Sequence, residues 1–277
     1  MLKVREFVTF SLVSLIQGVS SCIIIKFNVL SVGLTGRSQL IFAITSVGLL
    51  SSIIKFGSNL NIISLLKENK VDNVELRFMS FTVISSLFLG SICIFFMLAP
   101  KHSLIANFSI DSIVFYSIAT HISSSCLLLI NSYYSKRENV VISFAQSVTL
   151  LIATIGLNAL HPASIDANLN AYSISLLIPI IVYFSRNDID TLPNLITYIF
   201  KKPLESLNVC STQSLLLSVT KEVASRSKLI IPSFFLASSE YAIFSLLVSI
   251  GDMVFRFVEP ILTIQVRQEL ANKSLYK

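Results

Sequence analysis

The sequence predicts an all-α membrane protein, a polytopic bundle of about eight transmembrane helices. Of its 277 residues, 53% are hydrophobic and only 13% are charged, whereas about a quarter of the residues in a soluble domain are charged. Apolar runs of about 20 residues, the length of a helix that spans a bilayer, recur from end to end. These runs are continuous rather than alternating, which argues against a β-barrel.

Each expected span is an apolar run bounded by polar or charged residues. The seventh run differs from the others because four charged residues crowd its middle. A topology of seven spans, with residues 211–228 outside the bilayer, therefore remains an alternative. The eight expected spans cover residues 7–25, 39–57, 78–99, 112–134, 140–160, 168–185, 212–236 and 241–263.

Basic residues are distributed unevenly over the connections between these spans. If the N-terminus is cytoplasmic, fourteen of the 21 Lys and Arg residues lie on the cytoplasmic side. Only Lys26, Arg37 and Lys101 lie on the opposite side. The positive-inside rule then places both termini in the cytoplasm. It also accounts for the net charge of +6 without nucleic-acid binding, so no nucleic-acid partner is expected.

The chain divides into three parts. Residues 1–185 hold the first six spans, and residues 211–277 hold the last two spans with a cytoplasmic tail. Between them, residues 186–210 form a cytoplasmic linker. Its middle, residues 195–207, is amphipathic and carries two lysines, as expected of a helix that lies on the membrane surface. A plain tether is the alternative for this linker.

One polar stripe runs along the last expected span. Its six residues recur at spacings of four and three, so they share one face of a helix. At 1.5 Å per residue the stripe is about 27 Å long, nearly the thickness of a bilayer core. Ionisable groups within a span mark a functional pathway by default. The stripe consists of Ser245, Ser249, Asp252, Arg256, Glu259 and Thr263.

The second span carries a similar stripe at a constant offset of 204 residues. This correspondence predicts a duplicated fold with a six-helix repeat, as in transporters built from parallel repeats. The chain would then hold one full copy and the first two helices of a second copy. At this offset Ser249, Asp252, Arg256, Glu259 and Thr263 correspond to Thr45, Gly48, Ser52, Lys55 and Asn59.

Two motifs carry a family resemblance. The stretch 33-GLTGRSQLIFAITSVGLLSSIIKFG-57 resembles the opening motif of bacterial polysaccharide flippases, the Wzx-type O-antigen transporters of the multidrug/oligosaccharidyl-lipid/polysaccharide exporter superfamily. The stretch 238-SSEYAIFSLLVSI-250 is similar to a turn that recurs before the eighth helix in that family. Ser38 and Ala242 stand where the family has glycines. Family members have twelve or more helices, so the chain is expected to be truncated after its eighth helix.

The resemblance implies a transport function in lipopolysaccharide biosynthesis. The ligand would be an undecaprenyl-pyrophosphate-linked oligosaccharide that moves from the cytoplasmic to the periplasmic leaflet of the bacterial inner membrane. The expected partners are this lipid-linked oligosaccharide and the lipid bilayer, and other polysaccharide assembly proteins are left open as partners. No cofactor, metal site or catalytic residue is expected. A membrane enzyme such as a polysaccharide polymerase usually has a large periplasmic loop, which the expected topology lacks.

The expected substrate site consists of cationic and polar groups with carboxylates that offset part of their charge. Asp252 and Arg256, and likewise Glu222 and Arg226, are four residues apart and are expected to form ion pairs along a helix. Arginine suits a pyrophosphate because its planar fork binds phosphate in a bidentate manner. Three alternatives remain: ion pairs that only pin helices together, a multidrug-type exporter, and a truncated remnant that does not transport. The expected substrate-binding residues are Lys221, Arg226, Arg256, Lys55 and Asn59, and their charge partners are Glu222, Asp252 and Glu259.

Overall fold

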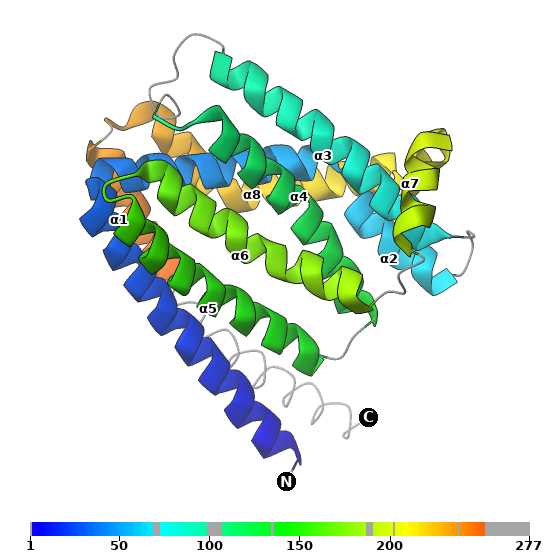
Figure 1. The fold of residues 1–277 in the computed structure, drawn as a ribbon, viewed down its shortest axis with the longest axis horizontal. Helices are drawn as coiled ribbons and strands as arrows, with labels where there is room; N and C mark the ends of the chain where they lie inside the picture. Colours follow the sequence, from blue (N-terminus) through cyan, green and yellow to red (C-terminus); the bar gives the residue numbers. More distant parts are fainter. Residues whose placement is uncertain are drawn as a thin grey trace, which may run out of the picture.

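The computed structural model describes residues 2–68, 73–98, 107–133, 136–186, 191–201, 203–237 and 239–252. Within these ranges every regular element is a helix, which confirms the all-α prediction. A further helical segment, without a label in Figure 1, covers residues 239–252. The labelled elements are α1 (Leu2–Ile54), α2 (Ser58–Glu68), α3 (Val74–Leu98), α4 (Ile110–Tyr133), α5 (Lys136–Leu160), α6 (Ile165–Arg186), α7 (Thr191–Lys201), the 3-10 helix η1 (Pro203–Val209) and α8 (Thr212–Phe235).

In the described part of the chain, five helices are long and apolar enough to cross a membrane. The count of eight spans stays a prediction. Helix α8 has 24 residues, but it is not one of the five, and it contains four charged side chains. The expected eighth span runs from residues 239–252 into residues outside the described ranges. The five candidate spans are Ile16–Ile54, Val74–Met97, Ile110–Ser132, Val140–Leu160 and Ile165–Arg186.

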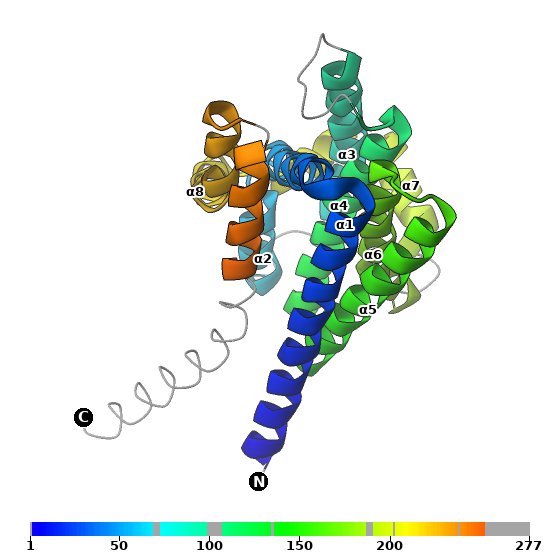
Figure 2. The same ribbon diagram turned by 90° about the vertical axis from the view of Figure 1, so that its left-hand side faces the viewer.

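Helix α1 bends sharply at Gly33, as Figures 1 and 2 show. Gly33 has φ 71° and ψ 176°, and glycine reaches positive φ without the penalty that a side chain would bring. The bend separates an N-terminal half (residues 2–32) from a C-terminal half (residues 34–54). The expected connection over residues 26–38 was therefore wrong as a loop, because one glycine makes the turn. Arg37, expected on that loop, lies inside the helix and is 1% exposed.

Two apolar clusters hold the bundle together. The first surrounds the C-terminal half of α1, where Leu40, Leu89 and Leu169 of α1, α3 and α6 are completely buried. The second lies toward the other end of α3 and includes Phe78 and Leu195. Because the second cluster also takes in side chains of α2, α4, α6 and η1, it ties the linker between α6 and α8 to the bundle.

The expected linker is helical and packs on α3 through both α7 and η1. Arg77 Nη2 of α3 lies 3.4 Å from Glu205 Oε2 of η1. Leu195 of α7 is buried, whereas Phe200 on the same helix is 81% exposed. The predicted amphipathic character therefore separates a protein-facing side from an outward apolar side. That the outward side lies on a membrane surface stays a prediction.

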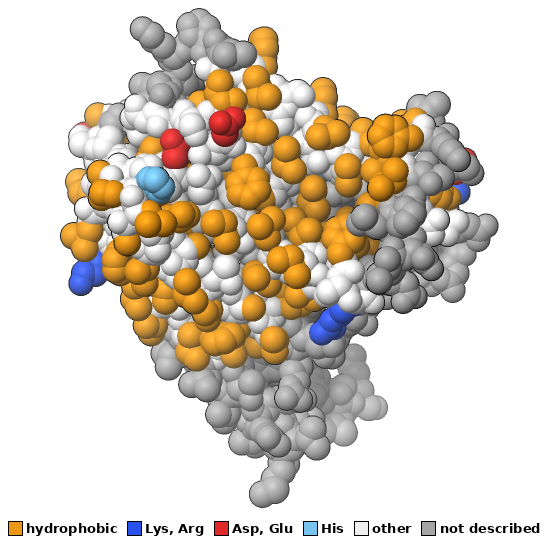
Figure 3. Space-filling model, viewed as in Figure 1, with side chains coloured by type: hydrophobic (Ala, Val, Ile, Leu, Met, Phe, Trp, Pro, Cys, Tyr) orange, Lys and Arg blue, Asp and Glu red, His pale blue; other side chains and the backbone are white. Residues whose placement is uncertain are grey.

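Large apolar side chains cover much of the outer surface. Figure 3 shows one such face, on which charged side chains are few. A contiguous apolar surface of this kind is unfavourable in water and is typical of contact with lipid or with another protein. It agrees with the apolar helices that make a membrane location plausible. The most exposed of these side chains on α3, α5 and α6 include Leu87, Phe88, Phe95, Phe96, Ile152, Leu160 and Ile181.

The turn between α1 and α2 provides a test of how α8 packs. Gly57 has φ 69°, and a Cβ added there would lie 2.1 Å from the backbone nitrogen of Leu215 at the start of α8. We expect Gly57→Ala to destabilise the fold by about 3 kcal/mol, because it combines a strained φ with overpacking against backbone. Thermal unfolding of the purified protein in detergent measures this change.

Gly156→Ala is the matched control, because nothing lies within 4 Å of a Cβ added at that glycine of α5. Alanine favours a helix over glycine by up to about 1 kcal/mol, so the control should unfold at the wild-type temperature or above it. An unchanged unfolding temperature for Gly57→Ala would contradict the close approach of α8 to the turn.

Candidate functional site

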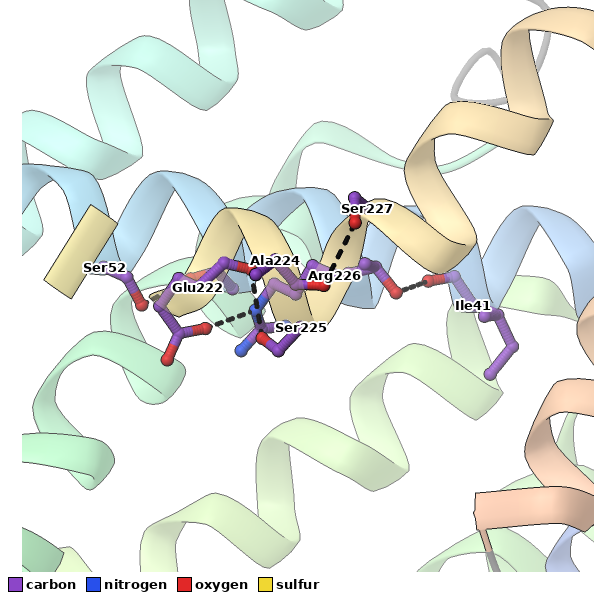
Figure 4. A network of polar contacts seen from close by, with 9 residues as sticks. Ile41, Ser52, Glu222, Ala224, Ser225, Arg226 and Ser227 are labelled. Carbon is purple, nitrogen blue, oxygen red and sulfur yellow. Dashed lines mark hydrogen bonds and ion pairs between the residues drawn. The ribbon is translucent and has the colours of Figure 1, made fainter. Parts of the chain in front are cut away.

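The C-terminal half of α1 and α8 lie side by side, and polar residues lie between them (Figures 1 and 2). Figure 4 shows this region, with Glu222 and Arg226 on α8 beside Ser52 on α1. Apolar helices rarely bring such residues together without a functional or structural reason. We name this region the α1–α8 seam and define it by Gly48, Ser52, Lys55, Glu222 and Arg226.

Arg226 occupies the middle of the seam. Its Nε donates a hydrogen bond of 2.8 Å to Glu222 Oε2, so the expected i,i+4 pair is present. Its guanidinium lies against Gly48, where an added Cβ would be 2.3 Å from Nη1 and 2.7 Å from Cζ. The guanidinium also lies within electrostatic range of Tyr116 on α4. The guanidinium therefore occupies the space that a side chain at position 48 would fill.

The Glu222–Arg226 pair is weak enough to exchange partners. The two side chains are 27% and 31% exposed, so solvent screens part of their attraction. Pairs at this spacing on a partly solvated helix stabilise it by about 0.5 kcal/mol. Only Nε of Arg226 bonds to Glu222, so the two terminal nitrogens of the guanidinium can donate to another group.

Lys55 follows directly after α1 and is 3% exposed. Its Nζ donates a hydrogen bond to Ser124 Oγ on α4. In the described part of the chain no carboxylate forms a salt bridge with Lys55, although Glu222 lies within electrostatic range. Glu222 therefore faces both Lys55 and Arg226, and one carboxylate cannot neutralise two cations. When Lys55 and Arg226 are both protonated, the five residues of the seam carry a net positive charge.

A buried histidine lies beneath Lys55. His121 of α4 is completely buried, and its Nδ1 and Nε2 lie 2.9 Å from Ser51 Oγ and 2.8 Å from Ser85 Oγ. Ser85 Oγ already donates to the Phe81 carbonyl at 2.6 Å, so it accepts from the ring Nε2–H, and Ser51 Oγ donates to Nδ1. Since Ser51 belongs to α1 and Ser85 to α3, His121 connects three helices behind the seam.

A second ion pair links α8 to the segment 239–252. Lys228 Nζ lies 2.5 Å from Asp252 Oδ1, with both side chains about half exposed (48% and 50%). Asp252 was expected to pair with Arg256, but Arg256 and Glu259 lie outside the described residues. Their roles therefore stay predictions.

Two further predicted residues do not join the seam contacts. Lys221 is exposed on α8. Asn59 lies in the first turn of α2, and its Oδ1 is buried without a hydrogen-bond partner in the described structure. Of the expected site residues, Lys55, Glu222 and Arg226 are thus the ones that the structure brings together.

Arg37 is a buried cation, although the sequence predicts it on the connection between the first two spans. Its Nη2 donates a 2.8 Å hydrogen bond to Ser249 Oγ. The sequence feature that could have predicted its burial is its spacing from Lys55. The two residues are eighteen positions apart, which is five turns of an ideal helix, so they project on the same side. The signal becomes visible only if the helix begins after Gly33 rather than at residue 39.

Cysteines and metal-binding groups contribute little to this region. Within the described residues no group of three or more His, Cys, Asp or Glu side chains could hold a metal ion. None of the four cysteines forms a disulfide in the described structure, and Cys93 and Cys126 are buried. Burial raises the pKa of the Cys210 thiol, in the connection before α8, to about 11. That thiol is therefore protonated and weakly reactive at neutral pH.

Comparison with protein-family models, with curated proteins and with solved structures finds no match for this chain. The resemblance to polysaccharide flippases thus depends on the two sequence motifs alone. The function must be inferred from the charges and contacts of the seam.

His121 provides a stability test for the framework behind the seam. We expect His121→Leu to destabilise the protein by about 2 kcal/mol, because two hydrogen bonds between helices are lost and the Ser51 hydroxyl is left buried. The control is His161→Leu in the exposed turn between α5 and α6, which should change stability by less than about 0.5 kcal/mol. Thermal unfolding in detergent compares the two; equal effects would refute the three-helix connection.

Proposed function

We propose that the chain moves an undecaprenyl-pyrophosphate-linked oligosaccharide, such as an O-antigen unit, from the cytoplasmic to the periplasmic leaflet of a bacterial inner membrane. The observation that carries this proposal is the charge imbalance of the α1–α8 seam. Lys55 and Arg226 face the single carboxylate of Glu222. An anionic group that enters the seam would supply the missing negative charge.

A pyrophosphate fits the chemistry of these side chains. The terminal nitrogens of Arg226 can form two parallel hydrogen bonds with phosphate oxygens. Lys55 adds a point charge without geometric demands. Both cations lie among apolar helices, where their attraction for an anion is stronger than in water. A multidrug-type exporter would be better served by acidic and aromatic groups, so the cationic seam favours the lipid-linked oligosaccharide.

Membrane location is supported by the five long apolar helices and by the apolar outer face (Figure 3). The uneven distribution of Lys and Arg favours an inner-membrane orientation with both termini in the cytoplasm. Other polysaccharide assembly proteins are proposed as partners only through the family resemblance.

Gly48→Ala tests the role of Arg226 with little change to the fold. The added Cβ would displace the guanidinium, which is the movable end of a flexible side chain, so the protein should fold normally. We expect export to fall at least about tenfold, the effect of losing one charge-assisted hydrogen bond to the ligand. The measurement is complementation of a flippase-null strain, scored by surface polysaccharide at equal protein level.

Gly90→Ala is the control, because a Cβ at Gly90 of α3 would make only ordinary contacts of 3.6 Å or more. It should export at the wild-type level. Full export by Gly48→Ala would mean that the seam only holds helices together. Failure of the wild-type chain to restore any export would favour the remnant that does not transport.

Reporter fusions test the proposed orientation. A fusion reports which side of the membrane its junction faces, and the distribution of basic residues predicts each result. A periplasmic signal at the last cytoplasmic position would contradict eight spans and favour seven. The expected cytoplasmic junctions follow Arg137, Lys202 and Lys273, and the expected periplasmic junctions lie near Lys101, Pro162 and Ser239.

A further inference from the structure

Arg37 is buried without a charge partner in the described part of the chain. The residue is 1% exposed, and its Nη2 donates to Ser249 Oγ. Its Nε and Nη1 are both buried and have no hydrogen-bond partner. An arginine stays protonated in proteins, so these two nitrogens carry positive charge that nothing in the described structure offsets.

A third unsatisfied donor, the Tyr241 hydroxyl, lies close by. Tyr241 is 1% exposed, and its hydroxyl is also buried without a hydrogen-bond partner. The phenol lies within electrostatic range of the Arg37 guanidinium, as does Tyr172 of α6. Two separate segments, the start of the C-terminal half of α1 and residues 239–252, thus bring three unused donor atoms into one buried region.

The local backbone adds to the positive potential. Because the helix restarts after Gly33, Arg37 lies in the first turn of the C-terminal half of α1, where the helix dipole favours negative charge. Ser249 does not supply that charge, since its hydroxyl accepts from Arg37 and donates to the Ser245 carbonyl at 2.7 Å. Ser249 holds the guanidinium in position and leaves Nε and Nη1 for another acceptor.

We propose that Arg37 and Tyr241 form an oxyanion-binding site, with Ser249 as the residue that positions the guanidinium. The ligand group is a phosphate or a carboxylate. Nε–H and the second N–H of Nη2 lie on one edge of the guanidinium and would donate to the oxyanion as a planar fork, and the Tyr241 hydroxyl would donate a third hydrogen bond. Such a group satisfies Nε, the Tyr241 hydroxyl and the buried charge together, whereas water would satisfy only the donors.

This site is distinct from the α1–α8 seam. Arg37 and Lys55 are eighteen residues apart, which corresponds to about 27 Å along a helix. The site therefore lies at the other end of the C-terminal half of α1. The identity of its ligand rests on the transport function proposed above. The oxyanion would be the pyrophosphate of the carrier lipid or the carboxylate of an acidic sugar. The existence of the site rests on Arg37 and Tyr241 alone.

Calorimetric titration of the full chain in lipid nanodiscs tests the site. The probes are pyrophosphate and glucuronate, each titrated at constant ionic strength. We expect at least one of them to bind to the wild-type protein and to bind at least about tenfold more weakly to Arg37→Gln. Lys26→Gln is the matched control, because it removes the same charge from an exposed position of α1 and should bind like the wild type.

Arg226→Gln separates this site from the seam. Binding that persists in Arg226→Gln and weakens in Arg37→Gln supports the Arg37 site. The reverse pattern overturns it while leaving the proposed function intact. If neither pyrophosphate nor glucuronate binds to the wild type, the Arg37 site is also overturned. Preference for pyrophosphate identifies the carrier lipid as the source of the oxyanion, and preference for glucuronate identifies an acidic sugar.

Two milder variants keep the test decisive if Arg37→Gln fails to fold. Arg37→Lys keeps the charge but loses the planar fork, and Tyr241→Phe removes only the hydroxyl. Each should weaken probe binding about fivefold or more, as expected for loss of one hydrogen bond to a charged group. Wild-type affinity in both variants would show that the buried guanidinium is compensated without a ligand.

Discussion

The packing of α8 on α1 depends on two places where α1 and its following turn have no side chain. At Gly48 the space is taken by the guanidinium of Arg226, and at Gly57 by the backbone of Leu215. The first glycine lets a charged side chain lie between apolar helices, and the second lets the start of α8 approach the turn. Because Glu222 and Arg226 already pair within α8, the helix brings its charges to α1 partly compensated. The seam follows from these contacts.

Local patterns in the sequence were sufficient for the helices and for the contacts within a helix. Continuous apolar runs predicted the all-α fold, and the spacing of Glu222 and Arg226 predicted their ion pair. The bend at Gly33 could not be predicted from the local pattern. The motif around Gly33 and Gly36 is compatible with a loop or with a one-residue bend, and the packing of Arg37 against the segment 239–252 distinguishes the two. The position of Arg37 is a tertiary effect.

Contacts between distant segments were also beyond local patterns. Lys55 bonds to Ser124, and His121 joins Ser51 to Ser85, yet no spacing along the chain relates these residues. The linker shows the same limit. Its amphipathic pattern predicted a helix on the membrane surface, but the pattern could not name α3 as the helix on which it packs. Helix formation is decided locally, whereas the choice of partner depends on which faces remain once all helices are present.

Under the proposed function, the two cationic regions on α1 would favour ligand at different stages of transport. Lys55 and Arg226 share a carboxylate, so the seam tolerates the absence of ligand at a moderate cost. Arg37 has no carboxylate partner among the described residues, so its region is the more unstable one when empty. A ligand is drawn toward the position where it relieves the larger uncompensated charge, but one that binds too tightly there cannot leave. The hydrogen bond from Ser249 reduces this cost, because it satisfies one of the guanidinium donors without neutralising the charge.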